Sequence, residues 1–143
     1  MRDVIRVQKL RPDAKLPFRA TDGATGYDLY ACIDGEMEVG QEPVRVPAGV
    51  AIETPTGLDV QIRPRSGLSA QGVMATFGTI DADYRGELMV TMYVLPFRGT
   101  HVVRNGDRIA QLVIGLVAEV DMEEVGELSL TERGAGGHGS TGR

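Results

Sequence analysis

The 143-residue sequence has one cysteine, no tryptophan and only 5% aromatic residues. Because Cys32 stands alone, an internal disulfide is impossible, which is typical of a chain in a reducing compartment. We expect Cys32 to be a small buried hydrophobe. With two histidines and neither H-x-x-H nor C-x-x-C spacing, a dedicated zinc or iron site is not expected.

The sequence also lacks long apolar runs and a net positive charge. No run approaches the roughly 20 residues of a membrane helix, and the opening MRDVIRVQKL has no apolar signal-peptide core. The net charge of -5 argues against general affinity for nucleic acid or anionic membranes. These features predict a cytoplasmic protein of one domain, with neither a nucleic-acid nor a membrane partner.

What is present is an alternation of apolar and polar residues, in short runs that are separated by glycine and proline turns. It predicts short strands at residues 4–10, 27–33, 42–47, 49–55, 59–64 and 87–96. Residues 107–122 are apolar enough for one or two buried strands, and only residues 66–72 suggest a helical turn or two. Many short strands in a single domain indicate an all-β sandwich, jelly roll or barrel.

The stretch GTIDADYRGEL, residues 78–88, combines acids, a cation and an aromatic ring between glycines. These residues are Asp81, Asp83, Tyr84, Arg85 and Glu87. A solvated hairpin turn needs Gly and Asp, but it does not need Ile80 before the turn or a Tyr at its tip. The pattern alone leaves open whether this is a turn or a site.

Two further polar groups stand where predicted strands begin or end. Asp28 interrupts ATGYDLYA, residues 24–31, and an exposed strand Asp is an equally good interpretation. In RPRSGLS, Arg65, Ser66 and Gly67 begin the possible helix, whose free amides and dipole favour an anion. Ser66 as a plain N-cap is the simpler alternative.

The last two groups lie nearer the C-terminus. Gln111 sits among apolar residues and needs partners, because an unpaired buried amide costs about 1–3 kcal/mol; a cross-strand hydrogen bond is sufficient explanation. Residues 132–143 hold five glycines and are either a disordered tail or a phosphate-binding segment. Together, a hydroxyl, a Gln, arginines (Arg65 and Arg133) and carboxylates suggest nucleotide polyphosphate chemistry.

Five stretches of the sequence resemble, in their order and spacing, the five motifs of the trimeric dUTPase family. They are ATGYDLYA, PRSGLS, GTIDADYRGE, GDRIAQLV and RGAGGHGSTG. The resemblance covers the chain from about residue 24 to its last residue. It implies a jelly-roll-like β-fold with at most one short helix, and a homotrimer that exchanges C-terminal tails between subunits. It divides the chain into a β-domain, residues 1–132, and a tail, residues 133–143, that closes over the active site.

The resemblance also implies Mg²⁺-dependent hydrolysis of dUTP to dUMP and pyrophosphate, which keeps uracil out of DNA and supplies dUMP for thymidylate synthesis. Asp81 is expected to be the general base, and Tyr84 to lie against the sugar where a ribose 2′-OH would sit. Asp28 is expected to hold Mg²⁺ through water. The residues expected to contact the substrate are Arg65, Ser66, Gly67, Thr76, Thr79, Ile80, Tyr84, Met89, Gln111, Arg133, His138, Gly139, Ser140 and Thr141.

The sequence departs from the family pattern at two places. His138 stands where the family usually has Phe, and no Asn precedes the hairpin, so Thr76 is the nearest polar substitute. A dCTP deaminase, or its bifunctional relative, and a catalytically silent nucleotide-binding module share the fold and are the alternatives. The complete hairpin with Asp81 and Tyr84 and the full Gly-rich tail favour dUTPase.

Overall fold

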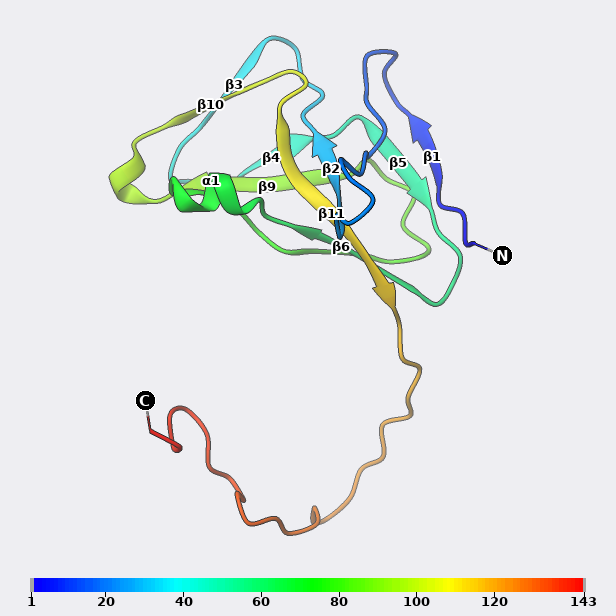
Figure 1. Cartoon of the computed structure of the whole chain (residues 1–143), viewed down its shortest axis with the longest axis vertical. Coiled ribbons are helices and arrows are strands. Elements are labelled where there is room, and N and C mark those ends of the chain that lie inside the picture. The colour runs from blue at the N-terminus through cyan, green and yellow to red at the C-terminus, as the bar shows by residue number, and fades with distance from the viewer. Residues whose placement is uncertain (1, 143) are drawn as a thin grey trace.

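A computed structural model describes residues 2–142 of the chain (Figure 1). Its elements are β1 (Arg6–Lys9), β2 (Gly26–Tyr30), β3 (Glu36–Val39), β4 (Val44–Pro47), β5 (Val50–Glu53), β6 (Leu58–Arg63), α1 (Ser66–Ala70), β7 (Val73–Ala75), β8 (Gly78–Ile80), β9 (Met89–Val94), the 3-10 turn η1 (Pro96–Arg98), β10 (His101–Arg104) and β11 (Arg108–Leu116). The predicted all-β class with one short helix at residues 66–72 is therefore confirmed.

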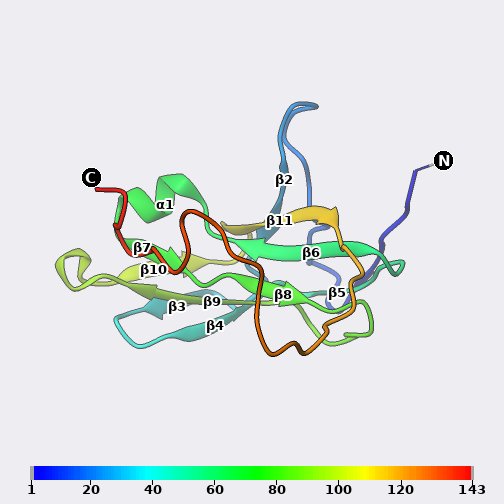
Figure 2. The ribbon, with the colours of Figure 1, turned by 90° about the horizontal axis from the view of Figure 1, so that it is seen from below.

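The strands form small antiparallel sheets that pack against one another. The largest has the order β2-β11-β6-β8, a second has β4-β9-β7, and the pairs β1-β5 and β10-β3 complete the body. Seen from below (Figure 2), β11 and β6 lie on one side of the body, and β9, β4 and β3 lie on the other. This arrangement is a sandwich, in which the inner faces of two sheets make the core.

The core follows the alternation seen in the sequence. Leu88, directly before β9, and Val90, Met92 and Val94 within it share one face, and each is at most 2% exposed. Burying one such side chain stabilises the fold by roughly 1.5–3 kcal/mol, so β9 anchors the sandwich. Cys32 is 3% exposed, as predicted for a small buried hydrophobe.

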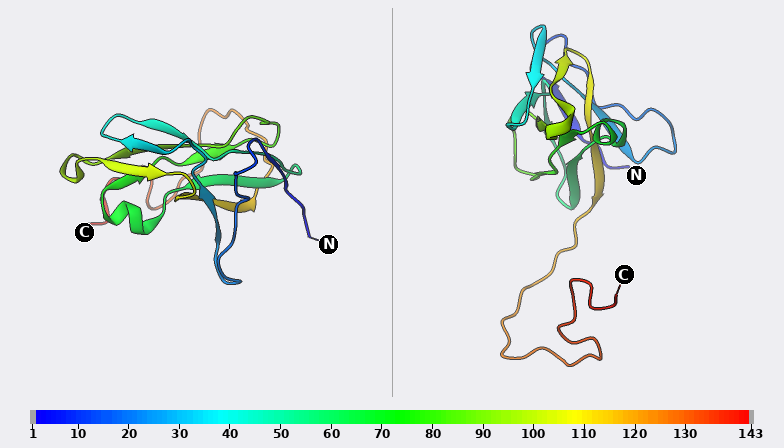
Figure 3. Two further views of the ribbon diagram at one scale, coloured as in Figure 1. Left: turned by 90° about the horizontal axis from the view of Figure 1, so that it is seen from above. Right: turned by 90° about the vertical axis from the view of Figure 1, so that its left-hand side faces the viewer.

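The prediction for residues 107–122 was too long. β11 pairs with β2 and β6 and ends at Leu116, and residues 117–142 contain neither helix nor strand. Beyond Leu116 the chain leaves the body, as the right-hand view of Figure 3 shows. The apolar side chains of this segment therefore have no sheet to pack against. Met122, for example, is 90% exposed.

The list of predicted strands also missed β3, β7, β8, β10 and the 3-10 turn η1. Strands β3 and β10 pair with each other. Each has only four residues, and HVVR in β10 does not alternate between polar and apolar side chains. No helix among residues 2–142 is long and apolar enough to cross a membrane.

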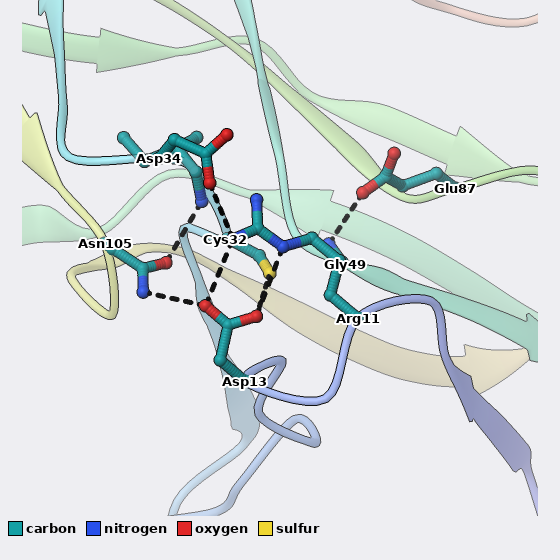
Figure 4. A network of polar contacts seen from close by, with 8 residues as sticks. Arg11, Asp13, Cys32, Asp34, Gly49, Glu87 and Asn105 are labelled. Carbon is teal, nitrogen blue, oxygen red and sulfur yellow. Dashed lines mark hydrogen bonds and ion pairs between the residues drawn. The ribbon is translucent and has the colours of Figure 1, made fainter.

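A polar network fastens the loop after β1 to the body (Figure 4). Asp13 accepts hydrogen bonds from Arg11, at 3.2 Å, and from the Asn105 amide, at 3.1 Å. Partial desolvation acts to raise the pKa of the Asp13 carboxyl, but these hydrogen bonds and the Arg11 charge outweigh it and lower that pKa. Asn105 in turn accepts from the Ile33 N–H at 3.0 Å, so one carboxylate links three separate segments.

Candidate active site

The stretch from β8 to β9 borders an open pocket of about 220 Å³. Five residues predicted to form the nucleoside site line it together. They are Thr79, Ile80, Asp81, Tyr84 and Met89. Residues 78–88 therefore form a turn that borders a pocket, and their role as a site stays a prediction.

Local hydrogen bonds hold the Tyr84 ring over the turn. The Tyr84 N–H donates to the Asp81 carbonyl at 3.0 Å, and the Tyr84 hydroxyl donates to the Glu87 carbonyl at 2.8 Å. The ring lies so close to Gly86 that a Cβ there would stand 2.6 Å from Tyr84 Cζ. A side chain at residue 86 would therefore push the Tyr84 ring aside, and that ring is 43% exposed beside the pocket.

The base of the hairpin is fixed by Glu87. Its carboxylate accepts a hydrogen bond from the Gly49 N–H at 2.9 Å, as Figure 4 shows. Gly49 directly precedes β5, so this bond links the hairpin to the strand that pairs with β1. Glu87 is thus a bracing residue, although its side chain also borders the pocket.

A second cluster forms where β2, β11 and β6 lie side by side. The register pairs Gln111 with Asp28 on one side and with Arg63 on the other. The Gln111 amide donates to the Pro64 carbonyl at 3.1 Å, so the cross-strand partner expected for it exists. Its side chain fills the space above Gly26, where a Cβ would collide with it.

The loop after β6 adds Arg65, Ser66 and Gly67 to this cluster. Arg65 donates to the Arg108 carbonyl at 3.1 Å, and the Arg108 guanidinium lies 4.0 Å from the Asp28 carboxylate. Arg65 is the N-cap of α1, and no side chain caps that helix. The alternative that Ser66 is an N-cap is therefore wrong: Ser66 is the first helical residue and its side chain is exposed.

The two clusters occupy different ends of β6. Ile80 pairs with Val60, so Asp81 lies beside the beginning of that strand, whereas Arg65 follows its end. At about 3.3 Å per residue, the five steps from Val60 to Arg65 span roughly 17 Å. A single chain therefore does not bring Asp81 to the cluster around Gln111.

The tail residues lie apart from both clusters. Arg133 donates to the Gly136 carbonyl at 2.8 Å, and the hydrogen bonds of residues 133–142 join them to one another or to Thr131. His138 adopts a positive φ of 49° in a turn before Ser140 and Thr141. In Figure 1 this part of the chain curves back far from the sheets. Thr76, just after β7, is exposed and does not line the hairpin pocket.

Three residues near the clusters were not foreseen in these positions. Arg45 and Glu87 border the hairpin pocket, and Arg108 faces Asp28. Glu87 and Arg108 fall inside the motifs GTIDADYRGE and GDRIAQLV, so their proximity to the predicted residues was a usable signal. Arg45 lies on β4, far away in sequence, and only the pairing of β4 with β9 brings it near.

The metal-binding potential of the second cluster is limited to one carboxylate. Among residues 2–142 no three His, Cys, Asp or Glu side chains gather closely enough to hold an ion. Asp28 is 20% exposed and directed to the Arg108 side of the cluster. A cluster with a single carboxylate suits a cation that keeps its water and takes most of its ligands from phosphates, as Mg²⁺ does. It does not suit a metal whose ligands all come from the protein.

Comparison with known proteins assigns the family. A family model described as dUTPase matches residues 12–142. The deoxyuridine 5'-triphosphate nucleotidohydrolase of Hydrogenobaculum sp. (strain Y04AAS1) is 49% identical over 140 residues, covering 95% of this chain and 96% of the relative. That of Treponema pallidum subsp. pallidum is 48% identical over 145 residues, covering 97% and 99%.

Comparison of the fold with solved structures identifies the same family. The Staphylococcus bacteriophage 80alpha dUTPase, in a structure with dUPNHPP, superposes with a TM-score of 0.86 at 27% identity, covering 98% of this chain and 99% of the phage protein. The jelly-roll-like class expected from the sequence is thus confirmed. With five ordered motifs, a hairpin pocket and near-complete coverage by its relatives, this chain belongs to the dUTPase family.

Proposed function

We propose that this protein hydrolyses dUTP to dUMP and pyrophosphate. The activity is the one named for the relatives that match nearly the whole chain. The observation that carries the proposal is the hairpin pocket, where Asp81, Tyr84, Ile80 and Met89 meet in about 220 Å³. Such a pocket suits one nucleoside beside a carboxylate.

In this proposal the hairpin selects the nucleoside and starts the reaction. Backbone groups near Thr79 and Ile80 bind the uracil edge, and the fixed Tyr84 ring lies against the deoxyribose, leaving no room for a 2′-OH. Asp81 takes a proton from the attacking water. General base catalysis of this kind typically accelerates a reaction by about 10²–10⁴-fold. The water then attacks the α-phosphorus in line, and pyrophosphate leaves.

The second cluster binds the phosphate chain. Arg65 offers a guanidinium, Ser66 a hydroxyl, and the first amides of α1 have no partners within the helix. Gln111 reaches the phosphates from β11, with its amide oriented by Pro64. Fixed donors of this kind hold the negative charge that builds up on the non-bridging oxygens.

Mg²⁺ is the cofactor that this cluster suits. Asp28 would hold it through water, and the remaining ligands would be phosphate oxygens and water. When bound, the ion neutralises charge on the triphosphate. Asp28 itself anchors the hydrated ion beside the phosphates, and Arg108 keeps that carboxylate in place.

The tail completes the site. Arg133, Ser140 and Thr141 supply a charge and two hydroxyls for the distal phosphates, and Gly139 lets the backbone approach closely. His138 stacks on the uracil in place of the usual Phe, as an imidazole ring also can. Residues 1–132 and 133–143 then act as the β-domain and its lid.

We further propose a homotrimer whose sites are shared between chains. Its first support is the roughly 17 Å along β6 between the hairpin and the phosphate cluster, which a second chain can bridge. Its second support is the tail, whose 16 residues from 117 to 132 can span roughly 50 Å when extended. Closed threefold symmetry gives three equivalent composite sites.

The surfaces of the chain favour this assembly. Residues 117–130 contain five carboxylates and no cation, alternating with apolar side chains such as Val120 and Leu130, which are 68% and 98% exposed. Strand β1, with Arg6 and Lys9, pairs only with β5 among the described residues. An acidic extended segment from a neighbouring chain is complementary to such a basic, open strand edge.

The decisive experiment is pyrophosphate release from purified protein with dUTP, dCTP, UTP and dTTP, with and without Mg²⁺. We expect rapid release from dUTP alone. Ammonia from dCTP would instead identify a dCTP deaminase or a bifunctional enzyme. Binding of dUTP without product would identify a silent module. Cytoplasmic location remains a prediction from the single cysteine.

A further inference from the structure

The Arg85 side chain folds back on the hairpin that carries Asp81 and Tyr84. Its Nη1 donates to the Ala82 carbonyl at 2.6 Å and to the Tyr84 carbonyl at 3.2 Å. Its Nη2 lies 3.6 Å from a carboxylate oxygen of Glu53, at the end of β5. One guanidinium thus joins two carbonyls of the hairpin tip to the neighbouring sheet.

Glu53 is itself held in position. Its other carboxylate oxygen accepts from Arg6 at 3.0 Å, and Arg6 and Glu53 are directly paired in the β1–β5 register. Arg6, Glu53 and Arg85 all line a groove of about 260 Å³ along these two strands. The carboxylate is therefore a fixed point on a paired strand, from which the hairpin tip is held.

Arg85 does not face the nucleoside side of the hairpin. Among the described residues, those that line the hairpin pocket include Asp81 and Tyr84 but not Arg85, which lies in the β1–β5 groove. Any effect of Arg85 on a nucleotide in that pocket is therefore transmitted through the backbone from residue 82 to residue 84.

The contribution of this contact to stability is small. The Arg85 and Glu53 side chains are 52% and 46% exposed, and exposed ion pairs typically contribute little. Its geometry is nevertheless specific, because the rigid fork of Arg can reach two carbonyls and a carboxylate at once, which a Lys ammonium on its flexible stem does not reproduce.

We infer that Arg85, held by Glu53, is a positioning residue that fixes Asp81 and Tyr84 for the reaction. The inference rests on the proposed dUTP hydrolysis and adds residues to which no role has been assigned. Displacing a catalytic group by about 1 Å can slow a reaction by as much as 10²-fold. Loss of the contacts that Arg85 makes with Glu53 and the hairpin carbonyls, here called the brace, should therefore lower turnover without weakening substrate binding.

The kinetic test uses Arg85→Gln, Glu53→Gln and the double variant. For Arg85→Gln we expect kcat to fall about tenfold with KM for dUTP within about twofold, since only the alignment of the base is lost. Because Glu53 acts through Arg85, the double variant should be no slower than Arg85→Gln. Arg85→Lys should recover only part of the activity.

Arg104→Gln is the matched control. Arg104 makes an exposed cross-strand ion pair with Glu36 at 3.0 Å, similar to that of Arg6 with Glu53 but on strands β10 and β3. Its kcat should equal that of the wild type. If Arg85→Gln keeps full kcat, or if KM rises while kcat is unchanged, Arg85 is not a positioning residue.

Hydrogen exchange of the Tyr84 amide provides a readout without substrate. This N–H donates to the Asp81 carbonyl at 3.0 Å, so its protection reports the order of the turn. Exchange should become faster in Arg85→Gln and Glu53→Gln but not in Arg104→Gln; equal exchange in all three would overturn the inference. A wild type inactive on dUTP would refute the proposed function alone, since exchange still decides whether the brace exists.

Discussion

Activity restored by mixing two inactive chains tests the shared site directly. The first chain carries Asp81→Ala and lacks the base; the second ends at Glu132 and lacks the tail. Both should fold, because Asp81 is exposed and the buried hydrophobic residues of the described chain end at Leu112. Each should form inactive trimers by itself.

The expected recovery follows from the layout of the site. The proposed trimer takes the hairpin and the tail of one site from different chains, and the tail, which leaves the body after Leu116, is long enough to reach a neighbour. A working site then needs an intact hairpin from the truncated chain and a tail from the full-length one. With random mixing each condition holds for one half of the positions, so about one quarter of the sites should recover.

The assay is pyrophosphate release after the two chains are unfolded and refolded as an equal mixture. Native mass spectrometry confirms that mixed trimers are present. The same chains combined without unfolding are the control and should remain inactive. If mixed trimers are abundant but no activity returns, hairpin and tail belong to one chain, and the shared site is refuted.

Three substitutions test the groups individually. Asp81→Asn should leave dUTP affinity nearly unchanged and lower kcat by about 10²–10⁴-fold, because it removes proton abstraction and preserves volume; a loss below tenfold in single-turnover rates would exclude Asp81 as the base. Tyr84→Ala should erode discrimination against UTP more than it slows dUTP turnover, and dTTP should stay excluded; equal losses for dUTP and UTP would refute the steric role. Burial, and then the nearby Arg98 guanidinium, lower the pKa of His101, so the unfolded chain binds its proton at higher pH than the folded one. The free energy of unfolding should therefore fall as the pH drops through about 6.5 toward the lower pKa of the folded chain, and urea titrations at fixed protein concentration should show a smaller fall for His101→Gln.

Much of the fold and part of each cluster could be predicted from the sequence. Alternation in residues 87–96 identified the buried face of β9, because a strand with one face in the core must place apolar residues at every second position. The motif GTIDADYRGEL identified Asp81 and Tyr84 as neighbours, and Met89 follows it directly, since a hairpin brings residues close in sequence close in space. Strands β3 and β10 were not predicted, because each has only four residues and HVVR in β10 does not alternate.

Only the tertiary structure decided how the clusters relate. The order β2-β11-β6 brings Asp28, Gln111 and Arg65 together, and the pairing of Val60 with Ile80 puts Asp81 at the other end of β6. Sequence spacing cannot fix these distances, because antiparallel partners are chosen by side-chain packing across the whole sheet. For the same reason the Glu53–Arg85 contact, made between residues on separate segments, became visible only when β5 and the hairpin lay side by side.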